Sequence, residues 1–316
     1  MVIQTNEIFS SESPTSLNTP VLFLIFNRPE TTEQVFSAIK KARPLRLYIA
    51  ADGPRSGYPD EANHCKIART VATNVDWDCE VKTLFRDQNL GCRLAVSQAI
   101  DWFFEQEPEG IILEDDCLPD QSFFWFCNEL LERYRDDTRI MHIGGTNFQF
   151  GKNRTNYSYY FSRYAHVWGW ASWRRAWKHY NEKLKKWHEA KKNGMLLHWT
   201  DDRHFINYWN RIFEKTASGE VDTWDYQWMF ACWSQNGLSI VPSANLVSNI
   251  GFSTDGTHTK KDSLLANMST NTINIPLVHP KMVTSHFKAD RFVECQQFSS
   301  PLIFRFFQKL ERLFTR

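Results

Sequence analysis

Short, mainly apolar runs recur along the first half of the chain and alternate with longer amphipathic segments. Apolar runs of this length are typical of buried parallel strands, whereas the longer segments carry helix signals. The pattern predicts strands over 21–26, 45–50, 81–85, 110–113 and 140–143. It also predicts helices over 60–73 and 92–104, one that begins at Thr31 or Thr32, and one that Asp120 caps. Repeated strand–helix units predict an α/β fold with a mostly parallel central sheet and helices on both faces.

The second half of the chain, from about Gly145, is less regular and richer in aromatic residues. No linker rich in Pro or Gly separates it from the first half, so we expect one compact body. The expected organisation is a flexible segment over 1–19, one domain over 20–290 and an amphipathic helix over 291–316. Within the domain, a regular part over 20–145 precedes an aromatic-rich part over 146–290.

The C-terminal segment 301–316 combines an aromatic face with several basic residues. A helix of this kind either packs on the body of the protein or contacts a membrane surface, and the sequence leaves both open. No apolar stretch reaches the length of a membrane span, and the first residues lack the pattern of a secretory signal. We therefore expect a cytoplasmic protein, with peripheral contact at the inner face of the membrane as the alternative.

Charge and cysteine content exclude some classes of protein. The 37 Lys and Arg residues nearly balance the 36 Asp and Glu residues, which leaves no basic footprint for nucleic acid. The seven Cys residues form no Cys-x-x-Cys pair, and their number is odd. This pattern argues against both a disulfide framework and a zinc site, and reduced thiols fit a cytosolic compartment.

Three consecutive acids, Glu114, Asp115 and Asp116, directly follow the apolar run 110–113. Adjacent carboxylates repel one another, and a hard divalent cation removes that cost. Mn²⁺ or Mg²⁺ prefers such oxygen ligands and, when held by only one or two carboxylates, keeps positions open for phosphate oxygens. The trio therefore predicts a metal–diphosphate site, with a solvated acidic turn as the alternative.

Other polar residues also follow predicted strands. In parallel α/β sheets, ligands bind outside the carboxyl ends of the strands, so these residues should meet at one edge. Asp52 could accept hydrogen bonds from a nucleoside, and Gly91 opens a helix whose N-terminus attracts anions. A turn-forming Asp and a plain helix start are the structural alternatives. The candidate donor-binding residues are Asn27, Arg28, Asp52, Gly53, Arg86, Asn89, Gly91, Glu114 and Asp115.

The second half adds candidates for an acceptor and for catalysis. Flat indole rings suit the apolar face of a sugar, which makes Trp168, Trp170 and Trp224 candidate acceptor contacts, although all three could be core. Asp225 stands among aromatic residues that can raise a carboxylate's pKa, and it could act as a base or as a helix cap. His258 lies in a Gly-, Ser- and Thr-rich loop and could bind the metal or phosphate.

The segment 111–116 resembles the Glu-Asp-Asp form of the metal motif in GT-A glycosyltransferases, which N-acetylglucosaminyltransferase I-like enzymes carry. The aromatic cluster 168–170, the segment 223–229 and the loop of His258 follow in the order of such an enzyme. The chain is also similar, over roughly 20–280, to bacterial family-2-like, hemolysin-like glycosyltransferases. The resemblance implies a Rossmann-like nucleotide-binding part and an acceptor-side lobe.

The resemblance also implies roles for matching positions. Asp116 would bind the metal, with His258 close to it, while Glu114 and Asp115 would contact the ribose or donor sugar. Asp225 would be the general base. Because the sequence around it departs from the pair of acids in that family, Asp222 is held in reserve.

We therefore expect a metal-dependent enzyme that moves a sugar, with inversion, from a nucleotide-diphosphate donor to a hydroxyl of a glycan or lipid-linked glycan. A UDP-sugar is the favoured donor, and polysaccharide biosynthesis in a bacterium is the expected setting. Three alternatives remain: a nucleotidyltransferase acting on sugar phosphates, a glycoside hydrolase and a non-catalytic carbohydrate-binding protein. The sequence does not distinguish among donor sugars or acceptors.

Overall fold

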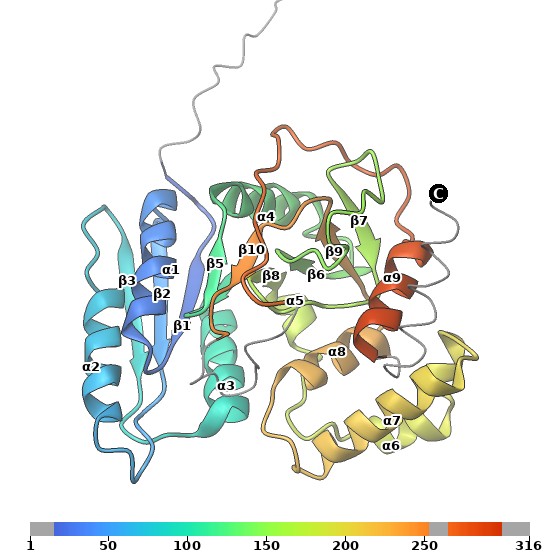
Figure 1. Cartoon of the computed structure of the whole chain (residues 1–316), viewed down its shortest axis with the longest axis horizontal. Helices are drawn as coiled ribbons and strands as arrows, with labels where there is room; N and C mark the ends of the chain where they lie inside the picture. Colours follow the sequence, from blue (N-terminus) through green and yellow to red (C-terminus); the bar gives the residue numbers. More distant parts are fainter. Residues whose placement is uncertain (1–15, 253–264, 299–316) are drawn as a thin grey trace, which may run out of the picture.

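The computed structural model describes residues 16–252 and 265–298. Its main feature is a mixed eight-stranded sheet in the order β3-β2-β1-β4-β8-β6-β9-β7 (Figure 1). The strands are β1 (Val21–Ile25), β2 (Arg46–Ala51), β3 (Glu80–Phe85), β4 (Glu109–Glu114), β6 (Ile140–Gly144), β7 (Tyr159–Ser162), β8 (Trp170–Trp173) and β9 (Leu238–Pro242). A second, antiparallel pair consists of β5 (Cys117–Pro119) and β10 (Val247–Asn249).

Helices cover both faces of the sheet (Figure 1). They are α1 (Pro29–Ala42), α2 (Glu61–Ala72), α3 (Gly91–Gln106), α4 (Gln121–Arg133), α5 (Arg174–Trp177), α6 (Trp187–Lys192), α7 (Arg203–Ala217), α8 (Asp225–Ser234) and α9 (Phe287–Val293). A 3₁₀ turn at Met195–His198 and a π-helical turn at Glu294–Phe298 complete the described elements. None of these helices is long and apolar enough to cross a membrane. Among the described residues, no Cys forms a disulfide bond.

The five predicted strands and four predicted helices of the first half are confirmed, with boundaries that differ by a few residues. Their residues divide between two cores, because successive side chains of a strand point to opposite faces. In β1, Val21 and Phe23 pack in the core beneath α1 and α4, whereas Leu22 and Leu24 pack in the core beneath α3. A strand buried on both faces must be apolar throughout, which explains its unbroken apolar run.

The strands β3, β2, β1 and β4 are parallel, as predicted, but the sheet continues through a strand that the sequence did not indicate. That strand, β8, lies antiparallel between β4 and β6. It consists of residues that we interpreted as part of an aromatic ligand cluster. Tryptophan side chains fit both a buried strand and a sugar platform, so the local sequence did not separate these structures.

The ends of the fold differ from the expected organisation. Leu17 is fully buried and pairs with Pro44, so the described fold already includes residues 16–19 of the segment that we expected to be flexible. At the other end, α9 and the π-helical turn pack on the body, which accounts for the start of the expected C-terminal helix. Residues 1–15 and 299–316 lie outside the described part of the chain.

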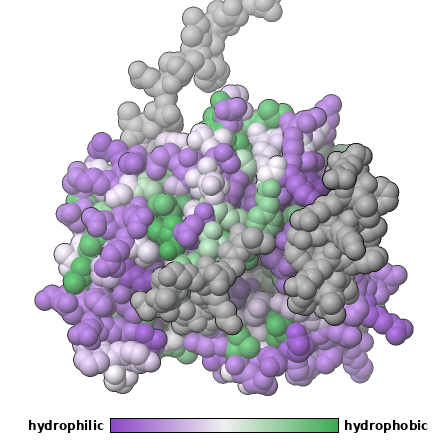
Figure 2. Space-filling view, viewed as in Figure 1, coloured by the Kyte–Doolittle hydropathy of each residue, from purple (hydrophilic) through white to green (hydrophobic). Residues whose placement is uncertain are grey.

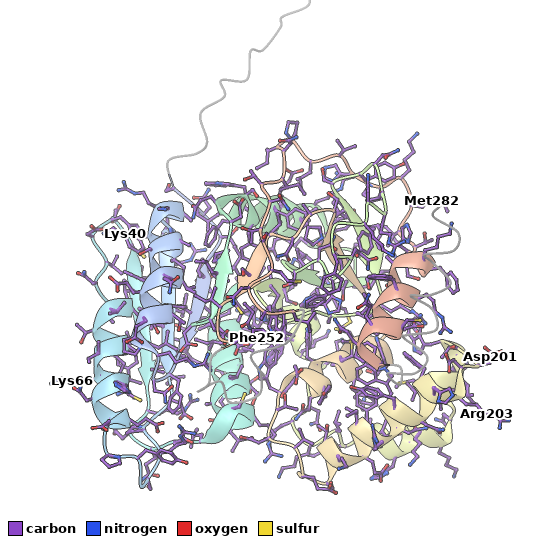
Figure 3. The ribbon with its side chains drawn as sticks, in the orientation of Figure 1. Lys40, Lys66, Asp201, Arg203, Phe252 and Met282 are labelled. Atoms are coloured by element: carbon purple, nitrogen blue, oxygen red, sulfur yellow. The ribbon has the colours of Figure 1, made fainter. Side chains whose placement is uncertain are left out.

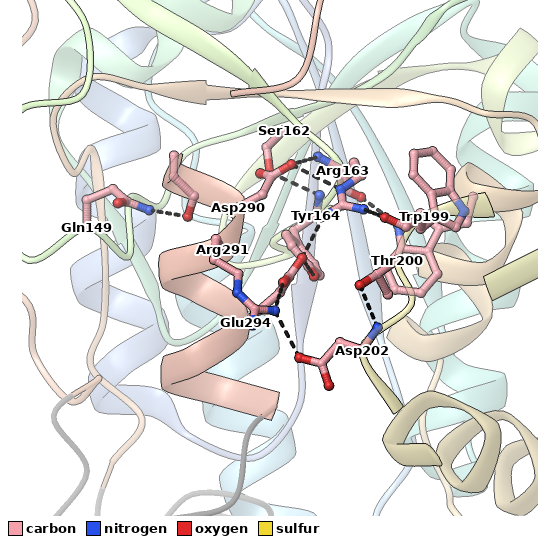
Figure 4. Close-up of polar contacts among 12 residues, drawn as sticks. Gln149, Ser162, Arg163, Tyr164, Trp199, Thr200, Asp202, Asp290, Arg291 and Glu294 are labelled. Carbon is pink, nitrogen blue, oxygen red and sulfur yellow. Dashed lines mark hydrogen bonds and ion pairs between the residues drawn. The ribbon is translucent and has the colours of Figure 1, made fainter. Parts of the chain in front are cut away.

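A network of buried charges attaches α9 to the body (Figure 4). The guanidinium of Arg163 donates to Asp290 at 3.3 Å and to Glu294 at 2.6 Å. The hydroxyls of Ser162 and Tyr164 donate to the same two carboxylates, at 2.6 Å and 2.9 Å. The side chains of Asp290 and Glu294 are only 1% and 5% exposed. Arg163 compensates the burial of both carboxylates, and Arg291 adds a second positive charge 3.1 Å from Glu294.

Replacing Arg163 with Met should lower the free energy of unfolding by about 3–5 kcal/mol, because buried Asp290 would lose its counter-charge and buried Glu294 would keep only Arg291. Urea unfolding measures this loss, with the exposed Arg203→Met as the control variant (Figure 3). A loss no larger than that of the control would show that the network contributes little.

The same variant should show a characteristic pH dependence. Burial raises the pKa of Asp290 to about 6 in spite of the neighbouring Arg163. Because this folded pKa exceeds the unfolded value of about 3.9, ionised Asp290 costs stability, and stability falls as pH rises from about 4 to about 6. Without Arg163 the pKa should rise further, so the stability deficit of Arg163→Met should be larger at about pH 7 than at about pH 5. An equal deficit at both pH values would contradict this account.

Candidate active site

A cavity of about 440 Å³ opens at the carboxyl ends of β1, β2 and β4. The loops that follow these strands form one wall, and the segments 167–168 and 222–225 of the second half form the other. Most of the predicted donor-site residues therefore meet at one edge of the sheet. Those that line the cavity are Arg28, Asp52, Arg86, Asn89, Gly91, Glu114 and Asp115, and the predicted metal ligand Asp116 lines it as well.

The three acids at the end of β4 do not point into bulk solvent. Asp116 accepts a 2.7 Å hydrogen bond from the guanidinium of Arg28, which lies 3.8 Å from Asp115. Asp115 also accepts the backbone N–H of Phe26 at 3.0 Å. The side chain of Glu114 makes no hydrogen bond to a described residue. The prediction of a solvated acidic turn is therefore wrong for this trio.

The carboxylates outnumber the nearby positive charges. Burial raises the pKa of Glu114 well above its usual value, and repulsion from Asp116, Asp115 and Asp225 raises it further. Burial likewise raises the pKa of Asp115 to about 7. Burial alone would lower the pKa of Arg28, but attraction to the carboxylates outweighs it and the pKa is raised. The site thus stabilises additional positive charge.

The segment after β10 packs directly on the Arg28–Asp116 pair. A side chain at Gly251 would place its Cβ 2.2 Å from Oδ2 of Asp116, so only glycine fits this close approach. Asn249 lies 3.5 Å from the other oxygen of Asp116. Phe252, at the centre of the molecule in Figure 3, meets the ring of Trp168 edge-on. His258 follows within residues 253–264, which lie outside the described residues.

Asp52 organises the loop that precedes α3. Its carboxylate accepts the backbone N–H of Leu90 at 3.0 Å, the backbone N–H of Gly53 at 2.9 Å and the side-chain amide of Asn89 at 2.9 Å. Burial raises its pKa, although these hydrogen bonds oppose the shift. Asp52 lines the cavity, but much of its hydrogen-bonding capacity already serves the protein.

The N-terminus of α3, where we expected a phosphate, is occupied by Asp222 from the second half of the chain. Its two carboxylate oxygens accept the backbone N–H groups of Cys92 at 3.1 Å and Arg93 at 3.2 Å. Gly91 has φ +78°, and a Cβ there would lie 2.7 Å from Asp222. An internal carboxylate thus satisfies the helix terminus that an anionic ligand would otherwise contact.

Replacing Asp222 with Ala should lower the free energy of unfolding by about 0.5–2 kcal/mol, because α3 would lose its cap. Asp222→Asn should retain most of this stability, since Asn also caps helices. Urea unfolding of the two variants tests the assignment. Equal losses in both would show that the charge of Asp222, rather than its hydrogen bonds, is required.

Asp225 begins α8 and lines the same cavity as the acidic trio. The N-cap of α8 is Trp224, which makes no capping hydrogen bond through its side chain. Asp225 occupies the first helical position and accepts a hydrogen bond from the hydroxyl of Thr223. The prediction that Asp225 caps this helix is therefore wrong, whereas its position in the cavity is compatible with a role in catalysis.

The three candidate acceptor tryptophans lie at different depths. Trp168 is half-buried and lines the cavity, and Trp224 is 2% exposed but also contributes to its wall. Trp170 is fully buried in β8 and stacks on Trp224, with ring centroids 5.6 Å apart. The prediction that Trp170 contacts an acceptor is contradicted by this burial. Trp170 instead supports Trp224 from the core.

Two predicted donor-site residues lie beside the cavity without lining it. The side-chain amide of Asn27 donates to Glu61 at 2.8 Å, and Gly53 packs against the backbone of Gln88. Sequence reasoning missed Arg55, which lines the cavity and pairs with the buried carboxylate of Glu61, and it missed Asn249. Arg55 directly follows the Asp-Gly-Pro turn after β2, a position that could have indicated it.

The donor set fits a cation with open coordination positions. Among the described residues, no three or more His, Cys, Asp or Glu side chains converge on a metal position, so a protein cage is not present there. Glu114 and Asp116 still offer oxygens in a site with an excess of negative charge. Mg²⁺ and Mn²⁺ sites with one or two carboxylates, completed by water and phosphate, have this character.

The fold and the site together define an α/β protein with a Rossmann-like sheet and a ligand cavity at the carboxyl ends of its strands. No protein-family model matches the chain, and no curated protein sequence matches it.

Three similar solved structures share only 7–10% sequence identity with the chain. A 4-diphosphocytidyl-2C-methyl-D-erythritol synthase from Anaerococcus prevotii has a TM-score of 0.35, with 70% of this chain and 87% of that chain covered. HddC from Yersinia pseudotuberculosis has a TM-score of 0.32, with 51% and 80% covered. A UDP-glucose pyrophosphorylase complexed with UDP-glucose has a TM-score of 0.27, with 46% and 62% covered. TM-scores this low support no conclusion about site or activity.

Proposed function

We propose that the protein is a metal-dependent glycosyltransferase that uses a nucleotide-diphosphate sugar, with a UDP-sugar as the favoured donor. The observation that carries the proposal is the arrangement of carboxylates around one cavity. Glu114, Asp115 and Asp116 lie on the wall formed by the sheet, and Asp225 faces them from the second half of the chain. Such a cavity can hold a charged donor on one side and admit a hydroxyl acceptor beside a base.

The chain's own residues would divide this work. Asp116 and Glu114 would hold the metal, which would neutralise the diphosphate and make it a better leaving group. Arg28 would remain beside the donor as a second positive charge. Asp225 would take the proton of the acceptor hydroxyl, so that attack from the opposite face inverts the sugar's configuration. Trp168 and Trp224 would form the acceptor wall, and Asp52 would fix the loop beside the nucleoside.

Transfer of a nucleotide to a sugar phosphate is the second candidate. It also needs carboxylates, a metal and phosphate. It should, however, need a triphosphate-binding loop after the first strand. In this protein α1 begins at Pro29, immediately after Arg28, which is paired with Asp116. The acidic wall at Asp225 also lacks a role in that reaction, so we prefer glycosyl transfer.

Thermal unfolding with UDP, with Mn²⁺ and with both together tests the proposal. We expect the largest increase in Tm with both, because a ligand that binds only the native state stabilises it by mass action. Protection by free glycan alone would instead identify a carbohydrate-binding protein. Release of sugar from a glycan without nucleotide would identify a hydrolase. Release of pyrophosphate from a nucleoside triphosphate and a sugar phosphate would identify the nucleotidyltransferase.

A further inference from the structure

Exposed apolar side chains gather on the outer side of α9 and the segment that leads to it. Met282 and Phe287 are 69% and 72% exposed, the highest values among large hydrophobic side chains of the described residues. Val278 and Phe150 are also exposed. Figure 3 shows Met282 at the outer margin of the molecule above α9, and Figure 2 shows hydrophobic residues along the upper edge, where the chain between β10 and α9 passes.

Backbone contacts place the segment 278–285, which includes Met282, alongside β7. The backbone of Val278 bonds to Ser158 just before β7, which is the edge strand of the sheet, and Ser285 pairs with Phe161 within that strand. On α9, Phe287 and Lys288 are exposed, whereas residues 289, 290 and 293 are buried against the body. The ring of Phe292 lies 6.5 Å from that of Phe150. We call the resulting surface the 278–288 face. It consists of the exposed side chains Val278, Lys281, Met282, Phe287 and Lys288 together with Phe150 and Lys152.

All the charged side chains of the 278–288 face are positive. Lys152, Lys281 and Lys288 are exposed, and the amino group of Lys152 lies 4.5 Å from the ring of Phe292. The segment 149–158 contains no acid, and the single acid of 275–292, Asp290, is buried against Arg163. Glu129, which reaches this region, lies 3.1 Å from the imidazole of His279. In a protein with a net charge of only +1, this local excess of lysine is distinctive.

We propose that the 278–288 face binds an anionic lipid surface. Exposed aromatic and aliphatic side chains enter the boundary between headgroups and acyl chains, while lysines beside them attract anionic headgroups. A protein partner with an acidic surface would explain the exposed lysines. It would not explain the four exposed apolar side chains beside them. This inference concerns a surface outside the cavity and goes beyond the proposed function.

Sedimentation of the full chain with vesicles tests this proposal. Vesicles of equal parts phosphatidylglycerol and phosphatidylcholine should bind the protein, and pure phosphatidylcholine vesicles should bind it less. Each lysine near an anionic surface contributes about 1 kcal/mol, so Lys281→Gln/Lys288→Gln should weaken binding by about 25-fold. Met282→Ser/Phe287→Ser should weaken it by about tenfold or more. Raising the salt from about 0.1 M to about 1 M should also weaken it, because the Debye length shortens from about 10 Å to about 3 Å.

Leu197→Ser is the matched control, since Leu197 is 66% exposed but lies outside the 278–288 face. All the replaced side chains are exposed, so the variants should keep the Tm of the native protein. Equal binding by the Leu197 and Met282/Phe287 variants would overturn the proposal. So would equal binding to both kinds of vesicle, or a dimer in solution that only the Met282/Phe287 variant disrupts. None of these outcomes depends on glycosyl transfer, so the proposal can fail independently of the proposed function.

Discussion

Replacing Asp225 with Asn is expected to lower the rate of sugar transfer by about 10²–10⁴-fold, the usual contribution of a general base. Donor binding should be nearly unchanged, because in the proposed mechanism Asp116 and Glu114, rather than Asp225, hold the metal and the diphosphate. Asn keeps the size of the side chain and can still accept the hydrogen bond from Thr223. The variant therefore removes the proton acceptor with little change in packing. Initial rates with a UDP-sugar and a glycan acceptor, together with UDP titrations, measure both effects.

Asp222→Asn provides a matched comparison for Asp225→Asn, because the two acids are three positions apart on the same segment. Asp222 already caps α3, and Asn preserves a cap, so Asp222→Asn should keep most of the transfer rate. The exposed Asp201→Asn serves as a control for general effects of removing a charge. If Asp222→Asn lost transfer while Asp225→Asn retained it, the base would be Asp222.

Asp116→Ala should abolish the effect of Mn²⁺ on UDP binding and lower turnover by about 10²–10⁴-fold. A bound cation supplies several kcal/mol of charge stabilisation to a leaving diphosphate, and about 1.4 kcal/mol corresponds to a factor of ten. The variant also removes the closest ion-pair partner of Arg28, so the guanidinium would keep only the more distant Asp115. Binding of UDP without Mn²⁺ should change much less than binding with it.

The measurement for Asp116→Ala is calorimetric titration of UDP with and without Mn²⁺, with the exposed Asp136→Ala as the control. Titration of Mn²⁺ alone, followed by the paramagnetic signal of the free ion, separates loss of metal from loss of nucleotide. Retention of the full Mn²⁺ effect in Asp116→Ala would remove Asp116 from the metal site. In that case Glu114, whose side chain makes no hydrogen bond to a described residue, would be the next residue to test.

Local sequence patterns predicted where the polar groups of the site lie, but not which residues they contact. The acids after β4 and the polar loops after β1 and β2 could be assigned to one edge, because parallel strands carry their carboxyl ends to the same side. The partners of those groups could not be assigned. Asp116 pairs with Arg28, 88 positions earlier in the chain, and Asp222 caps a helix 130 positions earlier. The periodicity of neighbouring residues carries no information about contacts between residues so far apart in the chain.

The sequence by itself determined the α/β class, the strands of the first half and the placement of the acidic trio, since each depends on the periodicity of neighbouring residues. The tertiary structure alone decided that Trp170 belongs to an inserted strand and that Asp222 replaces an anion at α3. It also decided that α9 is attached through buried charges. These features depend on which surfaces come into contact when the chain folds. The sequence next to a side chain does not specify its tertiary contacts.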